Sequence, residues 1–329
     1  MPEYVVAILF LLALYGLELI YFRLAVRYKI IDKPNKRSSH SRYTVRGGGI
    51  VFPIAVLGWW LLSGFPMPLF MTGLLLISLI SFVDDLNHVH SKVRFLFHFA
   101  AVGSLLFTVP NSLEWYWYIG VVVIMIGTIN AWNFMDGING ITGGYSLITL
   151  GTLYYINQFV HPFTDERLLI AVLLGLGVFN FFNFRKKAVC FAGDVGSVSI
   201  AFIVCFLLVQ LIISSQNLLY VGLILLYGLD TSTTMIFRAV RKENIFDAHR
   251  SHFYPFLVNE LMIPHLLIAA LYCAAQLGIN LFIVTQFYGN ESFSESFILL
   301  LLLLGISSAA FLGIRFSLEG KGHLMQTRS

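Results

Sequence analysis

Residues 47–83, GGGIVFPIAVLGWWLLSGFPMPLFMTGLLLISLISFV, contain two apolar runs that are separated only by Gly64-Phe65-Pro66. Each run, 47–63 and 67–83, has about the length that an α-helix needs to cross the hydrocarbon core of a bilayer. Backbone polar groups find no water in lipid, so a spanning segment of this kind must be helical. The stretch therefore predicts two membrane-spanning helices joined by a tight turn.

The rest of the chain repeats this pattern. Its 329 residues are 58% hydrophobic and 12% charged, whereas a soluble domain is about 25% charged. Mean hydropathy is +0.81. We therefore expect an all-α, polytopic membrane bundle of about eleven helices, with residues 1–329 in a single domain. The other predicted spans are 4–22, 95–110, 115–131, 141–159, 167–183, 196–214, 218–237, 264–286 and 296–314.

Eleven spans place the two termini on opposite sides of the membrane. With the N-terminus outside and the C-terminus cytoplasmic, 20 of the 21 Lys and Arg residues fall in cytoplasmic segments, and Arg167 alone falls outside. Such an excess of basic residues is typical of cytoplasmic loops. The net charge of +4 is too small to indicate nucleic-acid binding.

The same topology collects unusual polar residues on the cytoplasmic side. Asp84 and Asp85 are adjacent at the end of the third span. Two carboxylates at a membrane boundary repel each other and resist dehydration, which a cation or a cation-bridged phosphate would relieve. The alternative is a solvated helix end.

Segment 130–144 carries Asn130, Asn133, Asp136 and Asn139 among glycines. Amide, carbonyl and carboxylate oxygens suit a hard cation or a nucleotide, and glycine lets the backbone approach a ligand. The alternative is an Asx-Gly turn that merely links two helices. Such a turn does not require two Asn and one Asp three residues apart.

A third cluster begins at Asn183 and runs through the basic residues 185–187 to Gly193-Asp194-Val195-Gly196-Ser197, which opens the eighth span. Backbone N–H groups at a helix start favour anions. Mg²⁺ prefers one or two carboxylates together with substrate phosphates, so Asp194 is a candidate magnesium ligand. An ordinary helix cap is the alternative.

Two further loops are basic. The first, 32–49, ends in three glycines at a helix start, which suits phosphate. The last, 238–252, contains His249 and His252, but no Cys or third His joins them, so phosphate contact is favoured over a transition metal. A solvated loop or topogenic charge is the alternative for both. Asp230 lies inside the ninth span, where acidic residues are usually functional.

These clusters resemble the polyprenyl-phosphate N-acetylhexosamine-1-phosphate transferase superfamily, which includes the phospho-MurNAc-pentapeptide translocase and the enterobacterial-antigen and O-antigen initiating enzymes. The resemblance covers nearly the whole chain and depends on the order of five motifs. They are Asp32-Lys33-Pro34-Asn35, Arg46-Gly47-Gly48-Gly49, Val83-Asp84-Asp85, Asn130-x-x-Asn133-x-x-Asp136-Gly137-x-x-Gly140 and Phe191-x-Gly193-Asp194-x-Gly196-Ser197.

The resemblance implies roles for the polar residues. Asp194 would ligate Mg²⁺, with Mn²⁺ as a substitute, while Asp84 and Asp85 would serve the lipid phosphate or the metal. Phe191 would stack on uracil, and Asn133, Asp136 and Asn183 would bind nucleotide. The remaining substrate-binding candidates are Lys33, Arg46, His249, Arg250 and His252, and a second tier comprises Asn130, Asn139 and Asp230.

The implied reaction moves a sugar-1-phosphate from a UDP-sugar to undecaprenyl phosphate and releases UMP, at the cytoplasmic face of a bacterial inner membrane. The translocase has three consecutive histidines where this chain has His249-Arg250-Ser251-His252, and an Asp where it has Asn139. These departures favour the O-antigen and capsule-initiating branch. The alternatives are the translocase itself, a transporter or flippase, and a non-catalytic scaffold. The donor sugar and a homodimeric state are left open.

Overall fold

The computed structural model describes residues 2–32, 43–108, 115–244, 251–286 and 293–325. Within these ranges the chain is almost entirely helical. The α-helices are α1 (Glu3–Arg27), α2 (Val51–Leu62), α3 (Pro68–Leu86), α4 (Ser91–Leu106), α5 (Trp115–Met135), α6 (Ile141–Phe159), α7 (Glu166–Asn183), α8 (Gly193–Ser215), α9 (Leu225–Val240), α10 (Phe253–Asn259), α11 (His265–Thr285) and α12 (Phe293–Met325). The smaller elements are the strands β1 (Ile31–Asp32) and β2 (Thr44–Val45) and the 3-10 helices η1 (Gly48–Ile50) and η2 (Leu218–Ile224).

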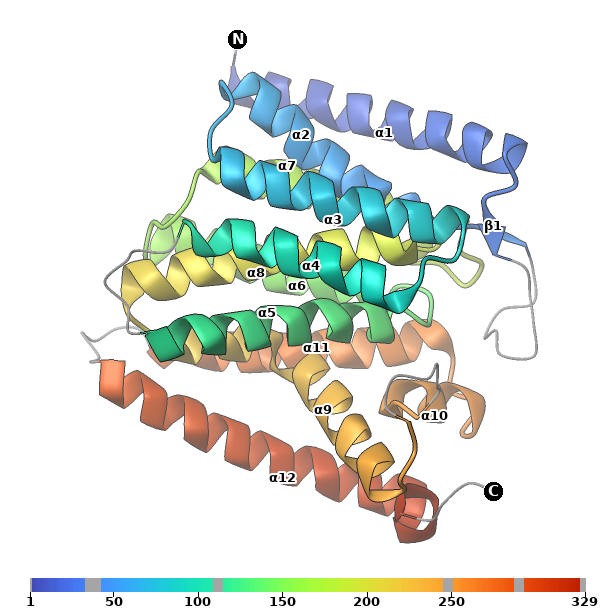
Figure 1. The fold of residues 1–329 in the computed structure, drawn as a ribbon, viewed down its shortest axis with the longest axis vertical. Coiled ribbons are helices and arrows are strands. Elements are labelled where there is room, and N and C mark those ends of the chain that lie inside the picture. The colour runs from blue at the N-terminus through green and yellow to red at the C-terminus, as the bar shows by residue number, and fades with distance from the viewer. Residues whose placement is uncertain (1, 33–42, 109–114, 245–250, 287–292, 326–329) are drawn as a thin grey trace.

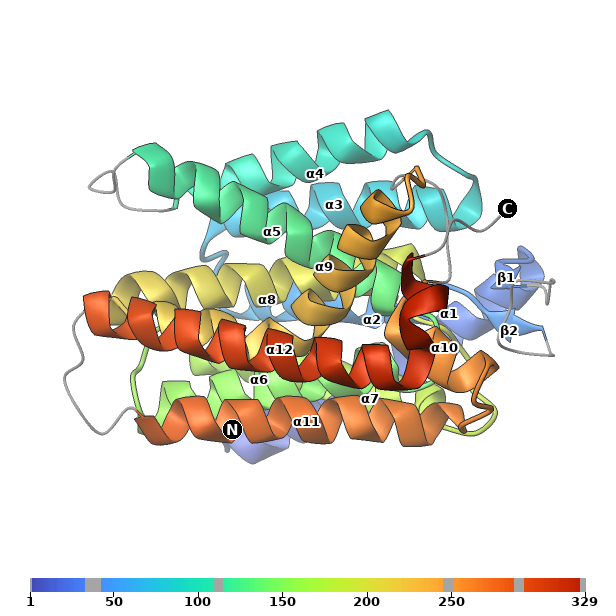
Figure 2. The same cartoon turned by 90° about the horizontal axis from the view of Figure 1, so that it is seen from below.

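The long helices lie side by side and run back and forth between two ends of a bundle (Figure 1). α1 begins at one end, and α12 finishes at the other, which is also the end that carries β1 and the short helix α10 (Figures 1 and 2). α9 departs from the common direction and crosses its neighbours at a tilt. Opposite ends for the two termini are what an odd number of spans requires.

Each of the eleven predicted spans coincides with a helix, which confirms a polytopic helical membrane protein. Eight of the helical segments in the described residues are long and apolar enough to cross a membrane on their own, and α2, α4 and α6 are not among them. α2 has 12 residues, about 18 Å of helix. It begins late because the chain before it forms β2 and η1, which are buried within the protein, where irregular backbone is tolerated at membrane depth.

Two boundaries differ from the prediction. α3 continues through Asp84 and Asp85, and α5 continues four residues beyond the predicted end, so Asn133 is helical rather than in a loop. Both extensions place polar residues in the last turn of a helix. The acidic pair can remain in α3 because protein groups solvate its carboxylates, as described below.

Burial divides the bundle into a centre and a lipid-facing rim. Most of α8 is buried, whereas α1 and α12 leave most of their apolar residues exposed, including Leu9, Leu12, Leu302 and Ile306. Exposed apolar surface of this extent is typical of helices that face lipid. Because Asp194 lies in the first turn of α8, the central helix of the bundle presents its N-terminus and this carboxylate to the end where the polar loops gather.

Candidate active site

Three carboxylates from two helices meet at this end of the bundle. Asp84 and Asp85 belong to the last turn of α3, and Asp194 belongs to the first turn of α8. Arg46 Nε lies 2.6 Å from Asp85 Oδ1, and its Nη2 lies 3.5 Å from Asp194 Oδ2. Arg94 Nη1 lies 2.6 Å from Asp84 Oδ2 and 3.6 Å from Asp194 Oδ2. We refer to these five residues as the carboxylate centre.

Asp85 is the most enclosed member of the carboxylate centre, with a side chain that is 0% exposed. Its Oδ1 accepts the backbone N–H of Asp194 at 2.9 Å, and its Oδ2 accepts that of Val195 at 2.9 Å. The carboxylate therefore caps the positive end of α8, which favours an acidic group. Asp85 thereby fixes α3 against the start of α8.

Asp84 holds the turn between α3 and α4. Its Oδ1 accepts the backbone N–H of Val89 at 2.6 Å, while its Oδ2 is paired with Arg94. Its carboxyl group also lies within hydrogen-bonding reach of the Asp194 carboxyl group. Two such groups at neutral pH share a proton or a cation, because their charges repel.

Asp194 has the loosest contacts of the three. Asn133 Nδ2 donates to its Oδ1 at 3.3 Å, and both guanidinium contacts exceed 3.4 Å. Its side chain is 18% exposed. The preceding Gly193 has φ 70°, and a Cβ there would lie 2.6 Å from Asp85 Oδ2, so only glycine fits this turn. Asp194 is therefore the carboxylate with room for a ligand.

This donor set is compatible with Mg²⁺. No group of three or more His, Cys, Asp and Glu side chains with metal-binding geometry occurs in the part of the chain that the structure describes. Mg²⁺ does not need one, because it keeps several waters and uses one or two carboxylates with substrate phosphates. Asp194 with Asp84 would supply those carboxylates, and Arg46 and Arg94 would face the phosphates.

Asp136 borders the carboxylate centre between α5 and α6. Thr142 Oγ1 donates to its Oδ1 at 2.7 Å, and the backbone N–H of Gly193 also bonds to the carboxylate. Burial raises the pKa of Asp136 to about 6. The side chain thus ties the start of α6 to the turn before α8.

The first glycine-rich loop lies against the same turn. Gly48 donates its N–H to Phe191 O at 2.8 Å, Gly49 donates to Ala192 O at 3.1 Å, and Phe191 donates to Val45 O at 2.8 Å. Residues 45–49 and 191–192, which are far apart in sequence, are thus joined by backbone hydrogen bonds next to Asp194. Tyr21 of α1 supports it, since its O–H donates to Arg46 O at 2.6 Å.

Comparison with known proteins finds similarity to a glycosyl transferase family and to several sugar-phosphate transferases. The family model described as glycosyl transferase family 4 matches residues 67–212, a range that includes all three carboxylates. The probable undecaprenyl-phosphate N-acetylglucosaminyl 1-phosphate transferase of Bacillus subtilis (strain 168) is 27% identical over 253 residues, 70% of each chain. These matches support the resemblance of the chain to the polyprenyl-phosphate N-acetylhexosamine-1-phosphate transferase superfamily.

Two further relatives represent both branches of this superfamily. A phospho-N-acetylmuramoyl-pentapeptide-transferase of Streptococcus equi subsp. equi (strain 4047) is 30% identical over 50% of this chain and 56% of its own. An undecaprenyl-phosphate alpha-N-acetylglucosaminyl 1-phosphate transferase of Yersinia pestis is 28% identical over 57% of each chain. The chain therefore spans little more than half the length of these two relatives.

The structure places the superfamily motif residues unequally. Asp84, Asp85, Asn133, Asp194 and Arg46 lie together in the carboxylate centre or bond to it. Lys33, His249 and Arg250 lie outside the described residues. The substrate contacts assigned to all of these residues stay predictions.

Two asparagines face the backbone. Asn183 accepts the N–H of Gly140 at 2.8 Å and donates to Cys190 O at 2.8 Å. Asn139 Nδ2 donates to Arg185 O at 3.0 Å. Both are buried, so they hold the 136–140 turn against the loop before α8. The nucleotide contact expected of Asn183 and the second-tier site role of Asn139 stay predictions.

Arg94 was missed at the sequence level. It was counted only as a topogenic charge, yet it bridges Asp84 and Asp194. Its ten-residue separation from Asp84 gives no helical-face signal, because α3 ends between them. Only the folded turn between α3 and α4 brings the pair together.

Proposed function

We propose that this protein transfers a hexosamine-1-phosphate from a UDP-sugar to undecaprenyl phosphate and releases UMP. The single observation that carries the proposal is Asp194, a loosely held carboxylate at the N-terminus of α8, flanked by Asp84, Arg46 and Arg94. A helix N-terminus with two arginines favours phosphate, and an acidic pair at that point favours a phosphate-bound cation. The relatives' names support the same chemistry.

In this reaction an oxygen of the lipid phosphate attacks the phosphorus that carries the sugar. A new P–O bond forms, the bond from that phosphorus to UMP breaks, and UMP leaves with the electron pair. A phosphate monoester has a second pKa of about 6, so much of the acceptor is already dianionic at neutral pH. A dedicated base is therefore unnecessary, and we assign Asp84 to orienting the acceptor.

Catalysis would be mainly positioning and charge neutralisation, as in phosphoryl transfer generally. Mg²⁺, held by Asp194 and Asp84, would neutralise charge on the diphosphate. Arg46 and Arg94 would stabilise the phosphate oxygens, and Arg46 also keeps Asp85 neutralised at the base of α8. Asn133 keeps Asp194 directed toward the ligand.

The site would face the cytoplasm, because the basic residues of the chain concentrate in the segments at this end. We favour a donor of the O-antigen and capsule-initiating branch, since Asn139 replaces an aspartate of the translocase motif. A MurNAc-pentapeptide donor remains the alternative, because relatives of both branches match the chain.

The test is a purified-protein assay with undecaprenyl phosphate, Mg²⁺ and a panel of donors. UDP-GlcNAc, UDP-GalNAc and UDP-MurNAc-pentapeptide are supplied separately, and UMP is measured. The proposal expects UMP only when lipid and donor are both present, with an N-acetylhexosamine donor preferred. Turnover with UDP-MurNAc-pentapeptide alone would move the chain to the translocase branch, and no UMP with any donor would overturn the proposal.

A further inference from the structure

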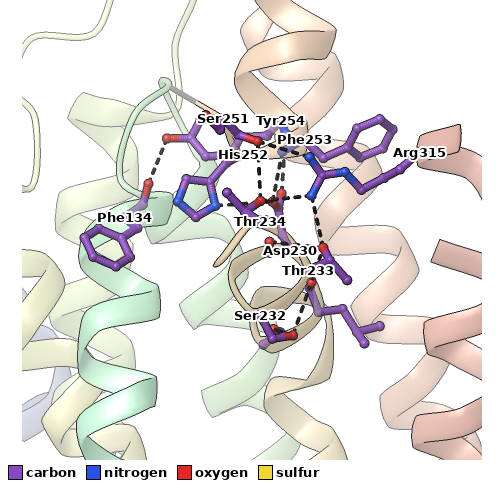
Figure 3. Close-up of polar contacts among 12 residues, drawn as sticks. Phe134, Asp230, Ser232, Thr233, Thr234, Ser251, His252, Phe253, Tyr254 and Arg315 are labelled. Carbon is purple, nitrogen blue, oxygen red and sulfur yellow. Dashed lines mark hydrogen bonds and ion pairs between the residues drawn. The ribbon is translucent and has the colours of Figure 1, made fainter. Parts of the chain in front are cut away.

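A second buried polar cluster lies beyond the carboxylate centre, around Asp230 of α9. The Asp230 side chain is fully buried. Its Oδ1 accepts the backbone N–H of Phe253 at 2.9 Å, and its Oδ2 accepts that of Tyr254 at 3.4 Å, at the start of α10 (Figure 3). Tyr272 of α11 donates its O–H to Oδ2 at 2.6 Å. His252 Nδ1 lies 3.3 Å from Oδ1.

Arg315 of α12 closes the cluster from the other side (Figure 3). Its Nη1 donates to the hydroxyls of Thr233 at 3.0 Å and Thr234 at 2.9 Å, and its Nη2 donates to Ser251 O at 3.0 Å. Its Nε donates to Glu319 at 2.5 Å. We refer to Asp230, Thr233, Thr234, His252, Tyr272 and Arg315 as the Asp230 cluster.

The cluster joins four elements in a dry environment. Burying charges is costly even when they are paired, and replacing a buried ionic network by apolar residues is often neutral or stabilising. Acidic and basic residues inside a membrane protein are accordingly rare unless they serve function. The Asp230 cluster therefore calls for a role beyond holding α9 to α12, and its contacts indicate which segment it places.

That segment is His252–Tyr254. Tyr254 donates its O–H to Phe134 O at 3.0 Å, and so satisfies a carbonyl in the last turn of α5 (Figure 3). A Cβ on Gly137 would lie 2.1 Å from Tyr254 Oη, so the tyrosine sits directly against the turn after α5. The His252 ring lies 5.8 Å from the Phe134 ring, centroid to centroid.

Phe134 stands between two residues of the candidate active site. Asn133 bonds to Asp194, and Asp136 bonds to Thr142 and to the backbone of Gly193. A continuous path therefore runs from Asp230 through the backbone of Tyr254, the Tyr254 hydroxyl and the end of α5 to Asp194. This path begins at the buried carboxylate of Asp230 in α9.

We propose that Asp230 is a positioning residue for the donor nucleotide-sugar. It fixes Tyr254 against the end of α5 and so sets the position of the Asn133–Asp136 segment that would receive the donor. The substrate named in this inference rests on the proposed function, whereas the coupling of Asp230 to Tyr254 and the end of α5 does not. Asp230 touches neither substrate nor reacting atoms, so the effect of its loss falls on donor binding rather than on the chemical step.

A double-mutant cycle tests the path. Asp230→Asn weakens the hold on Tyr254. Tyr254→Phe removes the hydroxyl that donates to Phe134 O. Thr233→Val is a matched control on the Arg315 side of the same cluster. Loss of one hydrogen bond corresponds to roughly a three- to tenfold effect. We expect Asp230→Asn and Tyr254→Phe each to raise the donor KM by about that factor, with kcat and the lipid KM within about twofold of wild type.

Because both changes act through one path, the double variant should resemble the stronger single variant rather than their product. Thr233→Val should leave the donor KM unchanged. The inference would be overturned if the two increases in donor KM multiplied in the double variant. It would also be overturned if the donor KM were unchanged in Asp230→Asn, or if it rose equally in Thr233→Val.

Hydrogen–deuterium exchange supplies a readout that needs no turnover. In Asp230→Asn we expect faster exchange both at Phe253 and Tyr254 and at residues 134–140. In Tyr254→Phe we expect it at 134–140 alone. Unchanged exchange at 134–140 in Asp230→Asn would overturn the positioning role. If the wild type releases no UMP, the proposed function fails while the exchange data still decide the mechanical coupling.

Discussion

The carboxylate centre and the Asp230 cluster both bury acidic side chains toward the same end of the bundle, but they satisfy them differently. Asp230 is fully buried and receives three donors at 3.4 Å or less from two other elements. Asp194 is partly exposed, and its contacts to Asn133, Arg46 and Arg94 are all 3.3 Å or longer. A carboxylate that accepts several short hydrogen bonds, such as Asp230, fixes the backbone that donates to it. A carboxylate with long contacts, such as Asp194, can bind a ligand instead.

The largest effect should come from removing divalent cation. Asp194 and Asp84 lie within hydrogen-bonding reach and would share the cation. Treatment with EDTA should abolish UMP release, and added Mg²⁺ should restore it, with Mn²⁺ as a weaker substitute. Ca²⁺, which favours more ligands and longer bonds, serves as the mismatched control. Undiminished turnover in EDTA would contradict the role of Asp194 as a metal ligand.

Asp194→Asn should lower kcat by on the order of a thousandfold, the scale of losing one preorganised electrostatic contact. Its thermal unfolding temperature should stay close to that of wild type, because the contacts of the side chain to Asn133, Arg46 and Arg94 are all 3.3 Å or longer. Glu166→Gln is the matched control, since Glu166 is an acidic residue in the first turn of α7, at the opposite end of the bundle. A variant with Mg²⁺-dependent turnover near wild type would contradict the ligand role.

The two neighbours in α3 should separate stability from activity. Asp85→Ala leaves the N–H groups of Asp194 and Val195 without their acceptor and Arg46 without its partner, a loss of roughly 2–4 kcal/mol of unfolding free energy. Asp84→Ala should lose turnover with a smaller fall in stability, because Asp84 accepts one backbone N–H, that of Val89, whereas Asp85 accepts two at the start of α8. Chemical or thermal unfolding in detergent, measured beside UMP release, checks the contrast, and equal destabilisation by both variants would break it.

Sequence patterns predicted the helical architecture well because a bilayer imposes both length and composition on each span. They also indicated that Asp84, Asp85 and Asp194 belong together. They could not indicate that Asp85 caps α8, since residues 109 positions apart meet only through helix packing. Asp230 was identified as unusual from its place inside a span, but its partners Tyr254, Tyr272 and Arg315 come from three other elements.

The smallest expected effect concerns Asp136, which lies between the two regions. Its pKa is raised by burial to about 6 in the folded protein, against about 3.9 when unfolded. The folded state therefore binds this proton more tightly than the unfolded chain does. The contribution of Asp136 to the unfolding free energy is fully present below about pH 4 and is lost as the pH rises through about 6. Asp136→Asn should remove that pH dependence and gain on the order of 1 kcal/mol at pH 7 after screening. Unfolding measured from pH 4 to pH 7 checks it, and an unchanged pH profile would contradict the buried carboxylate.

In the proposed reaction a sugar and its attached phosphate move together onto a lipid phosphate. The most direct measurement uses UDP-GlcNAc that carries ³H in the sugar and ³²P in the β-phosphate, with undecaprenyl phosphate and Mg²⁺. We expect both labels in the lipid fraction at equal stoichiometry and unlabelled UMP as the other product. Sugar label in the lipid with ³²P left on UDP would contradict it, as would the absence of any labelled lipid with every donor of the panel.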